Sequence, residues 1–385
     1  MIPYPSIRSL LESQVRRYGD RSFVISSSEG SRTKLSYNGF SRRVSHLAAL
    51  LQSEGLAHGD RIAIPAGNGI QTLVEYFAIW MMGCVGVPVN ATREERNRSS
   101  VRRSRASTVL FEMKEGLRTV HGFRTGRKSK LRDDVLIVLR TDNRGNLRGI
   151  VLSHYNILVN AMAIAGSLEL TDDQTVLCTA PLSGVTGIVG CIMSALYAGC
   201  RIVLGTEGKP DFLLKLIDRE GVHLAFADAQ LLTGFLGSSG FRRKNSQSTF
   251  KCFVSSHRHL APDITRKVER KFNVRVIPGF EIAEATCFSS FPPLSFSQPE
   301  STEGLPVGTA LHACEMTVLD GQGEECSEGQ TGWVAVRGHH VMKGYLDDEK
   351  ATAHAFRFGW LDSGERGFYE KSPDGVKYFT VTGRK

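Results

Sequence analysis

The sequence has no apolar run long enough to span a membrane, and its first five residues, from Met1 to Pro5, lack the charged head and apolar body of a signal peptide. We therefore expect a cytoplasmic protein with no membrane span. None of the eight cysteines forms a C-x-x-C pair, and most lie in apolar segments, as Cys191 and Cys200 do. This pattern disfavours a zinc or disulfide framework and predicts buried, reduced thiols.

Internal repeats and low-complexity tracts are also absent, so the 385 residues predict two or three subdomains with ordinary apolar cores. Apolar strand-like runs alternate with helical patterns, which favours the α/β class. Residues 1–172 predict a first wound α/β subdomain, and residues 173–290 predict a second one with five strands. The stretch 289–303 is rich in Pro and Ser and predicts a linker, and Gly-punctuated strands in 305–385 predict a small β-barrel.

Outside one segment, the basic and acidic residues of the chain balance. The formal net charge is +9, and Arg93 to Arg132 alone holds thirteen basic residues against four acidic ones, which is the same excess. A solvated helix (93–105) and a surface loop (115–130) are the plainer interpretation. The alternative is a patch for an acidic partner: a carrier-protein domain, the phosphates of coenzyme A, or nucleic acid. Nucleic acid is least favoured, because the segment has few aromatic residues to stack on bases and no recognisable reader motif.

A candidate nucleotide-binding turn lies between Asp133 and His154. An apolar strand (135–139) runs into a polar turn (140–149), and an apolar run then leads to a helix-compatible segment after Ser153. A turn that ends at a helix N-terminus is a ready-made site for a phosphate. The segment therefore predicts a phosphate-binding turn.

This turn resembles the AMP-binding signature of the adenylate-forming superfamily, which includes acyl- and aryl-CoA synthetases, luciferases and peptide-synthetase adenylation domains. The signature is approximately T-S-G-T-T-G-x-P-K-G. Its first Thr and two of its glycines match Thr141, Gly145 and Gly149, and Arg148 takes the place of its Lys. The signature's first Gly is replaced by Asp142, one of its Thr residues by Arg144 and its Pro by Leu147. Further matches follow in the family's order at residues 67–70, 83–90, 341–346, 351–356, 359–365 and 382–385.

The resemblance implies the large N-terminal domain of these enzymes, in which two wound α/β subdomains interleave and a small β-barrel follows. The family's small C-terminal subdomain, which brings a catalytic Lys, has no counterpart in the sequence, and we expect it to be absent from this polypeptide. Spaced matches in one order are a strong signal for fold. They are a weaker signal for chemistry, because fold does not imply function.

The resemblance also assigns site residues. In the family's Y-G-M-T-E segment the aromatic residue stacks on adenine and the Glu helps to hold Mg²⁺, so Phe280 and Glu284 are the candidates for these roles. Glu365 replaces the family's ribose-binding Asp, and Arg384 matches an Arg that contacts the nucleotide. The predicted ATP/AMP site is completed by Thr141, Gly145 and Arg148. The alternative is that Phe280 belongs to the core and Glu284 is a surface carboxylate.

Other positions weaken this site. Ala283 replaces the family's Thr, which bonds the α-phosphate, and Glu281 adds a negative charge that repels a triphosphate in a dry cleft. A second Gly-rich turn of the family is replaced by Ser256 to Leu260, in which His257 and Arg258 bring bulk. Low turnover is therefore predicted, since a single donor in a comparable site contributes roughly 2.7 to 4 kcal/mol.

The resemblance implies an acid–thiol ligase. Such an enzyme uses ATP to activate a carboxylic acid, fatty or aryl, to acyl-AMP, and transfers the acyl group to coenzyme A or to the phosphopantetheine of a carrier protein. Two hypotheses stay open. One is a divergent ligase that still binds ATP and Mg²⁺; the other is an ATP-incompetent pseudo-ligase that binds a carrier domain or another protein partner. The sequence matches no code for a particular substrate.

Overall fold

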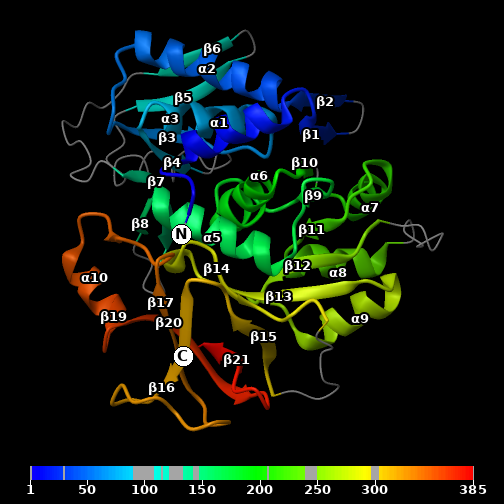
Figure 1. The fold of residues 1–385 in the computed structure, drawn as a ribbon, viewed down its shortest axis with the longest axis vertical. Helices are drawn as coiled ribbons and strands as arrows, with labels where there is room; N and C mark the ends of the chain where they lie inside the picture. Colours follow the sequence, from blue (N-terminus) through cyan, green and yellow to red (C-terminus); the bar gives the residue numbers. More distant parts are fainter. Residues whose placement is uncertain are drawn as a thin grey trace.

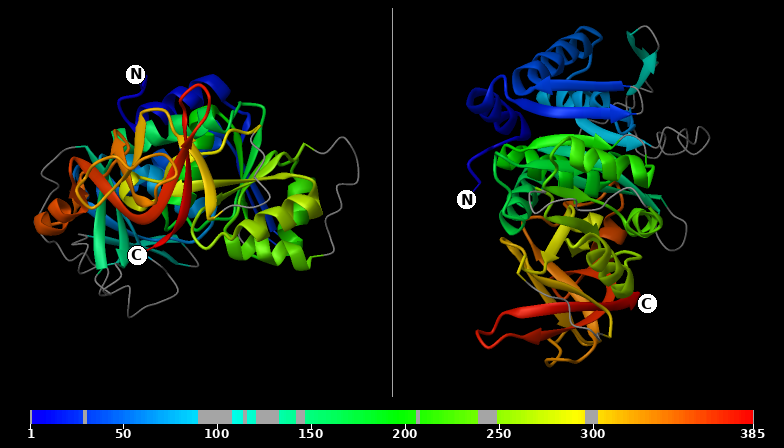
Figure 2. Two further views of the ribbon diagram at one scale, coloured as in Figure 1. Left: turned by 90° about the horizontal axis from the view of Figure 1, so that it is seen from below. Right: turned by 90° about the vertical axis from the view of Figure 1, so that its right-hand side faces the viewer.

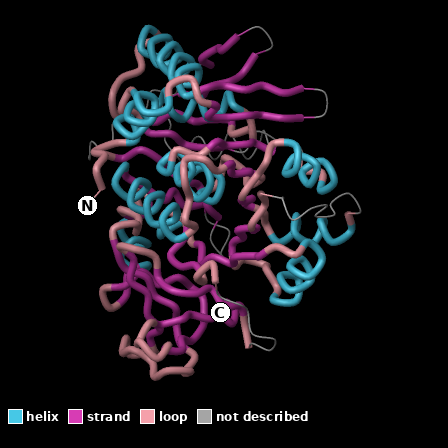
Figure 3. The backbone as a smooth tube through the Cα atoms, turned by 45° about the vertical axis from the view of Figure 1, so that its right-hand side comes forward, coloured by secondary structure: helices cyan, strands magenta, loops and turns pink. Residues whose placement is uncertain are grey.

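The computed structural model describes residues 2–28, 31–89, 108–113, 116–120, 133–141, 147–205, 208–238, 249–295 and 303–384, with the backbone alone for 108–113, 116–120 and 384. It confirms the predicted α/β class: mixed sheets and their helices are stacked in three tiers along the long axis (Figure 1, and from the side in Figure 2). Helices lie mainly in the upper two tiers, and strands dominate the lowest (Figure 3). None of the helices in the described part of the chain has both the length and the apolarity needed to cross a membrane.

The first sheet runs in the order β18 (Gly344–Tyr345), β8 (Leu147–Ser153), β7 (Asp134–Thr141), β4 (Val85–Val89), β3 (Arg61–Pro65), β5 (Thr108–Met113) and β6 (Gly116–Val120). Its centre is parallel: β3, β4 and β7 are short apolar runs with mostly buried residues, as strands covered by helices are. Trp80 of the neighbouring helix donates a 2.9 Å hydrogen bond from Nε1 to Val135 O, which fixes that helix on β7.

The upper part of the second sheet runs in the order β13 (Arg275–Glu281), β12 (Cys252–Ser256), β11 (Leu224–Phe226), β9 (Thr175–Cys178), β10 (Arg201–Gly205), β1 (Ser22–Ser28) and β2 (Ser31–Ser36). The sheet continues into the third tier through the antiparallel pairing of β13 with β14 (Phe288–Phe291). The five strands predicted within residues 173–290 are present. β1 pairs in parallel with β10, and β2 pairs antiparallel with β1. A hairpin from the start of the chain thus forms the β1–β2 edge of this sheet.

Helices cover both sheets. Three of them begin at Ser6, Ser36 and Ser153, whose side chains each accept a hydrogen bond from the backbone N–H three residues later. The helices are α1 (Ile7–Tyr18), α2 (Tyr37–Ser53), α3 (Ile70–Met81), α5 (His154–Ser167), the π-helix η1 (Thr186–Met193), α6 (Ser194–Ala198), α7 (Pro210–Arg219), α8 (Ala229–Gly237), α9 (Pro262–Phe272), the 3₁₀ turn η2 (Ala283–Ala285) and α10 (Glu349–Ala355).

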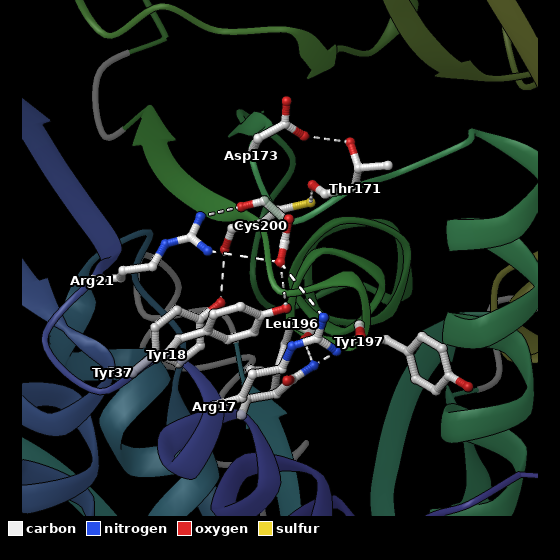
Figure 4. Close-up of polar contacts among 11 residues, drawn as sticks. Arg17, Tyr18, Arg21, Tyr37, Thr171, Asp173, Leu196, Tyr197 and Cys200 are labelled. Atoms are coloured by element: carbon white, nitrogen blue, oxygen red, sulfur yellow. Dashed lines mark hydrogen bonds and ion pairs between the residues drawn. The ribbon is translucent and has the colours of Figure 1, made fainter.

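Polar contacts tie α1 and α2 to the second sheet (Figure 4). Gln14 Nε2 donates to Leu196 O at 2.8 Å, and the Tyr18 hydroxyl donates to Asp172 Oδ2 at 3.0 Å. The buried Tyr37 hydroxyl donates to Cys200 O at 3.0 Å, just before β10. These bonds join segments more than 150 residues apart in the chain, so they hold the N-terminal helices against the region that surrounds the second sheet.

The third tier is antiparallel, in the order β16 (Cys314–Leu319), β17 (Gly332–Gly338), β20 (Trp360–Lys371), β21 (Lys377–Arg384), β15 (Leu305–Ala310) and β14 (Phe288–Phe291), with β19 (Phe356–Arg357) beside β20. β16 also contacts β14 and β15, so the sheet curls back on itself as the predicted small barrel requires. The predicted linker 289–303 is wrong in its first part. Residues 289–291 belong to β14, because Phe288 and Phe291 bury their rings in the core.

The basic segment Arg93 to Arg132 lies outside the residues whose side chains the structure describes, as does the helix predicted at 93–105. The loop predicted at 115–130 is corrected in part. Residues 116–120 form β6, which pairs antiparallel with β5.

Candidate functional site

A cleft of about 360 Å³ opens between elements of all three tiers. Its walls come from the β7–β8 hairpin, the turn after β13, the β18–α10 segment and a turn within β20. It is lined by Arg140, Arg148, Ile282, Glu284, Tyr345, Ala351, His354, Ala355, Asp362, Ser363 and Gly364. Two of the predicted site residues, Arg148 and Glu284, therefore face one cavity, and a third, Glu365, follows directly after its wall.

Both ends of the predicted phosphate turn, residues 140–141 and 147–149, belong to strands in the structure. β7 extends to Thr141 and β8 begins at Leu147, and these two residues pair across the hairpin. Thr141 is exposed at the strand end, and Gly145 lies outside the described residues. Gly149 is required by packing, because a Cβ there would lie 3.0 Å from Ile137 Cγ2 and 3.1 Å from Leu346 Cβ. The described ends of the predicted turn are thus paired strands, and β8 lies against the 344–346 segment.

Glu284 is anchored at three points. Its Oε2 lies 2.6 Å from Arg140 Nη1, and its Oε1 accepts a 3.0 Å hydrogen bond from the Tyr345 hydroxyl. Its backbone oxygen accepts a 2.8 Å bond from the Met342 N–H. Burial, together with the neighbouring Glu284 carboxylate, raises the pKa of Tyr345, so the phenol stays protonated and keeps donating.

These contacts bear on the predicted magnesium site. A cation at Oε2 of Glu284 would compete with the Arg140 guanidinium, and Oε1 already accepts the hydrogen bond from the Tyr345 hydroxyl. Among the described residues, no group of three or more His, Cys, Asp or Glu side chains is placed to hold a metal ion. The described residues alone do not form a Mg²⁺ site, and Glu284 as a ligand of Mg²⁺ stays a prediction of the resemblance.

Arg148 lies on the other side of Tyr345. Its Nη1 is 2.8 Å from Asp348 Oδ2, and its guanidinium carbon is 5.2 Å from the centroid of the Tyr345 ring. Asp348 also accepts a 2.9 Å hydrogen bond from the Ala351 N–H and so begins α10. The loop from β18 to α10 is therefore attached to the hairpin through Arg148.

Phe280 does not face the cleft. It is completely buried in β13, and the His257 ring lies against it with 4.8 Å between centroids and an angle of 31° between the ring planes. His257 Nδ1 accepts a 3.1 Å hydrogen bond from the Glu281 N–H, which sets the orientation of the imidazole. Stacking of Phe280 on adenine stays a prediction, and it requires His257 to move.

Glu365 is buried beside the same histidine. Its Oε1 lies 3.6 Å from His257 Nε2 and 3.6 Å from Arg258 Nη1. Burial lowers the pKa of Arg258, and the nearby Arg140 lowers it further. Arg384 is opposite Glu365 in the β20–β21 ladder, although its side chain lies outside the described part of the chain. The roles of Glu365 and Arg384 at a ribose stay predictions.

Three residues at or beside the cleft were not predicted as site residues from the sequence: Arg140, Tyr345 and Asp348. Tyr345 lies within the matched segment 341–346, and Arg140 lies at the edge of the predicted turn. The sequence thus indicated both regions but gave neither residue a role. The contact between Arg140 and Glu284 spans 144 residues of sequence, and only the packing of the hairpin against the turn after β13 reveals it.

Comparison with known proteins identifies the family. The model of the family described as AMP-binding enzyme matches residues 11–143 and 144–346. Feruloyl-CoA synthase of an Amycolatopsis species is 25% identical over 372 residues, which cover 91% of this chain and 74% of that protein. Oxalate–CoA ligase of Arabidopsis thaliana is 23% identical over 416 residues, which cover 98% of this chain and 79% of that protein.

Solved structures have the same fold. The N-terminal subdomain of Klebsiella oxytoca NpsA, in complex with 3-hydroxybenzoyl-AMSN, superposes with a TM-score of 0.81 at 21% identity and covers 98% of both chains. The inhibitor-bound N-terminal domain of FACL13 from Mycobacterium tuberculosis gives a TM-score of 0.84 at 16% identity, over 99% of this chain and 100% of that one. With a family model that matches most of its residues and this fold, the chain belongs to the AMP-binding enzyme family, whose members form adenylates.

Proposed function

We propose that this chain is the nucleotide- and acid-binding domain of an acid–thiol ligase. Its reference activity is the ATP-dependent activation of a carboxylic acid, fatty or aryl, to acyl-AMP for transfer to coenzyme A or a carrier protein. One observation carries the proposal: the cleft unites Arg148, Glu284 and the 362–364 turn that directly precedes Glu365, and these come from three distant parts of the sequence. These are three of the segments to which the resemblance assigns phosphate and ribose contacts.

The residues of the cleft suit individual parts of this reaction. Attack of a carboxylate on the α-phosphate builds negative charge on phosphate oxygens, which Arg148 neutralises as a fixed cation. Asp348 and the Tyr345 ring hold the Arg148 side chain in place, so little reorganisation accompanies the reaction. The Ser363 hydroxyl donates to Val334 O, and the Glu365 N–H donates to the same hydroxyl at 3.1 Å, so the turn that precedes Glu365 is preorganised.

We propose that turnover is impaired. Ala283 offers no hydroxyl to an α-phosphate, and the phosphate turn has lost one of the signature's three glycines and all of its hydroxyl residues except Thr141. Each missing donor in a concerted site lowers the rate by roughly 100- to 1000-fold. The ion pair between Glu284 and Arg140 should lower turnover further, because the carboxylate neutralises Arg140 instead of supporting a nucleotide complex.

A second candidate is an ATP-incompetent module that binds a carrier domain or another protein partner. The observation that favours it is the His257 imidazole, which covers the face of Phe280 that the resemblance assigns to adenine. Buried contacts of His257 and Arg258 with Glu365 cover the assigned ribose position as well.

Isothermal titration of this chain with ATP·Mg²⁺ and with a non-hydrolysable acyl-AMP mimic separates the two candidates. The ligase proposal expects micromolar binding of the mimic and carboxylate-dependent release of pyrophosphate across a panel of fatty and aryl acids. Absence of binding at millimolar concentrations of both compounds would refute it and leave the binding module. The His257→Gly variant adds a control, because it uncovers Phe280 and should strengthen binding only if adenine stacks there.

A further inference from the structure

Two arginines stand side by side in the wall of the cleft. Arg140 and Arg148 are directly opposite each other in the β7–β8 ladder, and both side chains line the same cavity. Opposite residues on neighbouring antiparallel strands have Cβ atoms about 4.5 to 5.5 Å apart, and like charges there destabilise the pair. An arrangement of this kind needs carboxylates nearby, or an anion that uses both guanidiniums.

Carboxylates lie beside both arginines. Glu284 Oε2 lies 2.6 Å from Arg140 Nη1, and Asp348 Oδ2 lies 2.8 Å from Arg148 Nη1. Tyr345 lies between the pairs, with its hydroxyl on Glu284 and its ring beneath the Arg148 guanidinium. Both arginines are thus held at fixed positions, and both remain partly exposed, by 31% for the Arg140 side chain and 26% for that of Arg148.

We propose that Arg140 and Arg148 form a two-arginine clamp for a phosphoryl group, and that the clamp works without a divalent cation. A guanidinium carries five N–H donors in a planar fork that matches phosphate geometry, so the carboxylate contact at Arg140 Nη1 does not saturate that side chain. Glu284 completes the design as a positioning residue. The guanidinium at its Oε2 takes the place where a metal ion would bind, and so supplies the positive charge from within the chain.

This proposal deepens the proposed function and rests on it for the source of the phosphoryl group, which is a nucleotide or pyrophosphate. The neighbouring carboxylates compete with an anion for the guanidiniums, so the affinity depends strongly on ionic strength. Magnesium should bring no gain. A metal-complexed polyphosphate presents less negative charge to the arginines than the free anion does.

The test measures binding of pyrophosphate, AMP and ATP by titration calorimetry, in EDTA and again with excess Mg²⁺. Variants are Arg140→Gln, Arg140→Lys and Arg148→Gln. The control is Arg337→Gln, which removes an exposed strand arginine that pairs with Glu315 at 2.5 Å outside the cleft. Thermal unfolding of every variant shows that it is folded, and Arg140→Lys keeps a cation beside Glu284 should Arg140→Gln not fold.

The clamp predicts binding in EDTA that Mg²⁺ does not strengthen. Arg140→Gln and Arg148→Gln should each weaken it by about 10- to 100-fold, Arg140→Lys by less, and Arg337→Gln not at all. Binding of pyrophosphate shows that the phosphoryl group suffices, whereas binding of AMP or ATP alone shows that the nucleoside is also needed. Absence of binding in EDTA, a requirement for Mg²⁺, or clamp variants that bind like the wild type would overturn the proposal.

The outcomes also separate this inference from the proposed function. Arginine-dependent binding of pyrophosphate without any acid-dependent release of pyrophosphate from ATP supports the clamp and counts against the ligase. Acid-dependent release of pyrophosphate that needs Mg²⁺ and is unchanged in the Arg140→Gln variant supports the ligase and refutes the clamp.

Discussion

The ion pair between Arg140 and Glu284 gives a prediction about stability that is independent of any ligand. The two side chains are 31% and 13% exposed, and their atoms approach to 2.6 Å. Removing either one leaves the other partly buried and unpaired, and Glu284→Ala also leaves the Tyr345 hydroxyl without its acceptor. Both single substitutions should therefore destabilise the protein. The double substitution should lower the free energy of unfolding by less than the sum of the two single losses.

The magnitude lies between two limits. Exposed ion pairs couple by about 0.2 to 1 kcal/mol, and breaking a fully buried pair costs about 3 to 5 kcal/mol. For a pair with these exposures we expect a coupling free energy of about 1 to 2 kcal/mol. The matched control is Arg337 with Glu315, a closer pair at 2.5 Å whose side chains are 51% and 60% exposed, and which should couple by no more than about 0.5 kcal/mol.

Urea unfolding of the wild type, Arg140→Gln, Glu284→Ala and the double variant gives the coupling through a double-mutant cycle. The same cycle on Arg337 and Glu315 gives the control. Equal coupling in the two cycles would refute the reasoning, because burial of Glu284 would then contribute nothing. Coupling near zero at Arg140 would also remove the basis for Glu284 as a positioning residue.

Three further predictions concern the packing of the protein. Tyr37→Phe removes the donor to Cys200 O and should lower the free energy of unfolding by about 1 to 2 kcal/mol in urea, with no change in ligand binding. Gly149→Ala should cost about 1 to 3 kcal/mol, since its Cβ would press on Ile137 and Leu346; an unchanged urea midpoint would contradict this. Burial lowers the pKa of His340 to about 4 from 6.5, so the unfolded state binds the proton first and stability is lost as the pH falls from about 6.5 toward 4. His340→Asn should reduce the loss of stability between pH 7 and pH 5, as followed by urea midpoints.

The arrangement of the secondary structure was largely predictable from the sequence. The strands of the second subdomain are short apolar runs separated by helical patterns, and this local signal is strong because the strands are buried on both faces. Residues 289–291 of β14 were predicted as a linker and not as a strand. The serines of β14 suggested a linker, although Phe288 and Phe291 were the residues that mattered for burial.

The family and the segments that border the cleft can be identified from the sequence, because ordered motifs survive in it even where single residues have changed. The contacts between those segments are visible only in the folded chain. The pairing of Arg140 with Glu284, the His257 ring on Phe280 and the contact of Glu365 with Arg258 join residues from about 20 to 140 positions apart. Such contacts depend on strand register and on side-chain packing between subdomains, which no local pattern encodes.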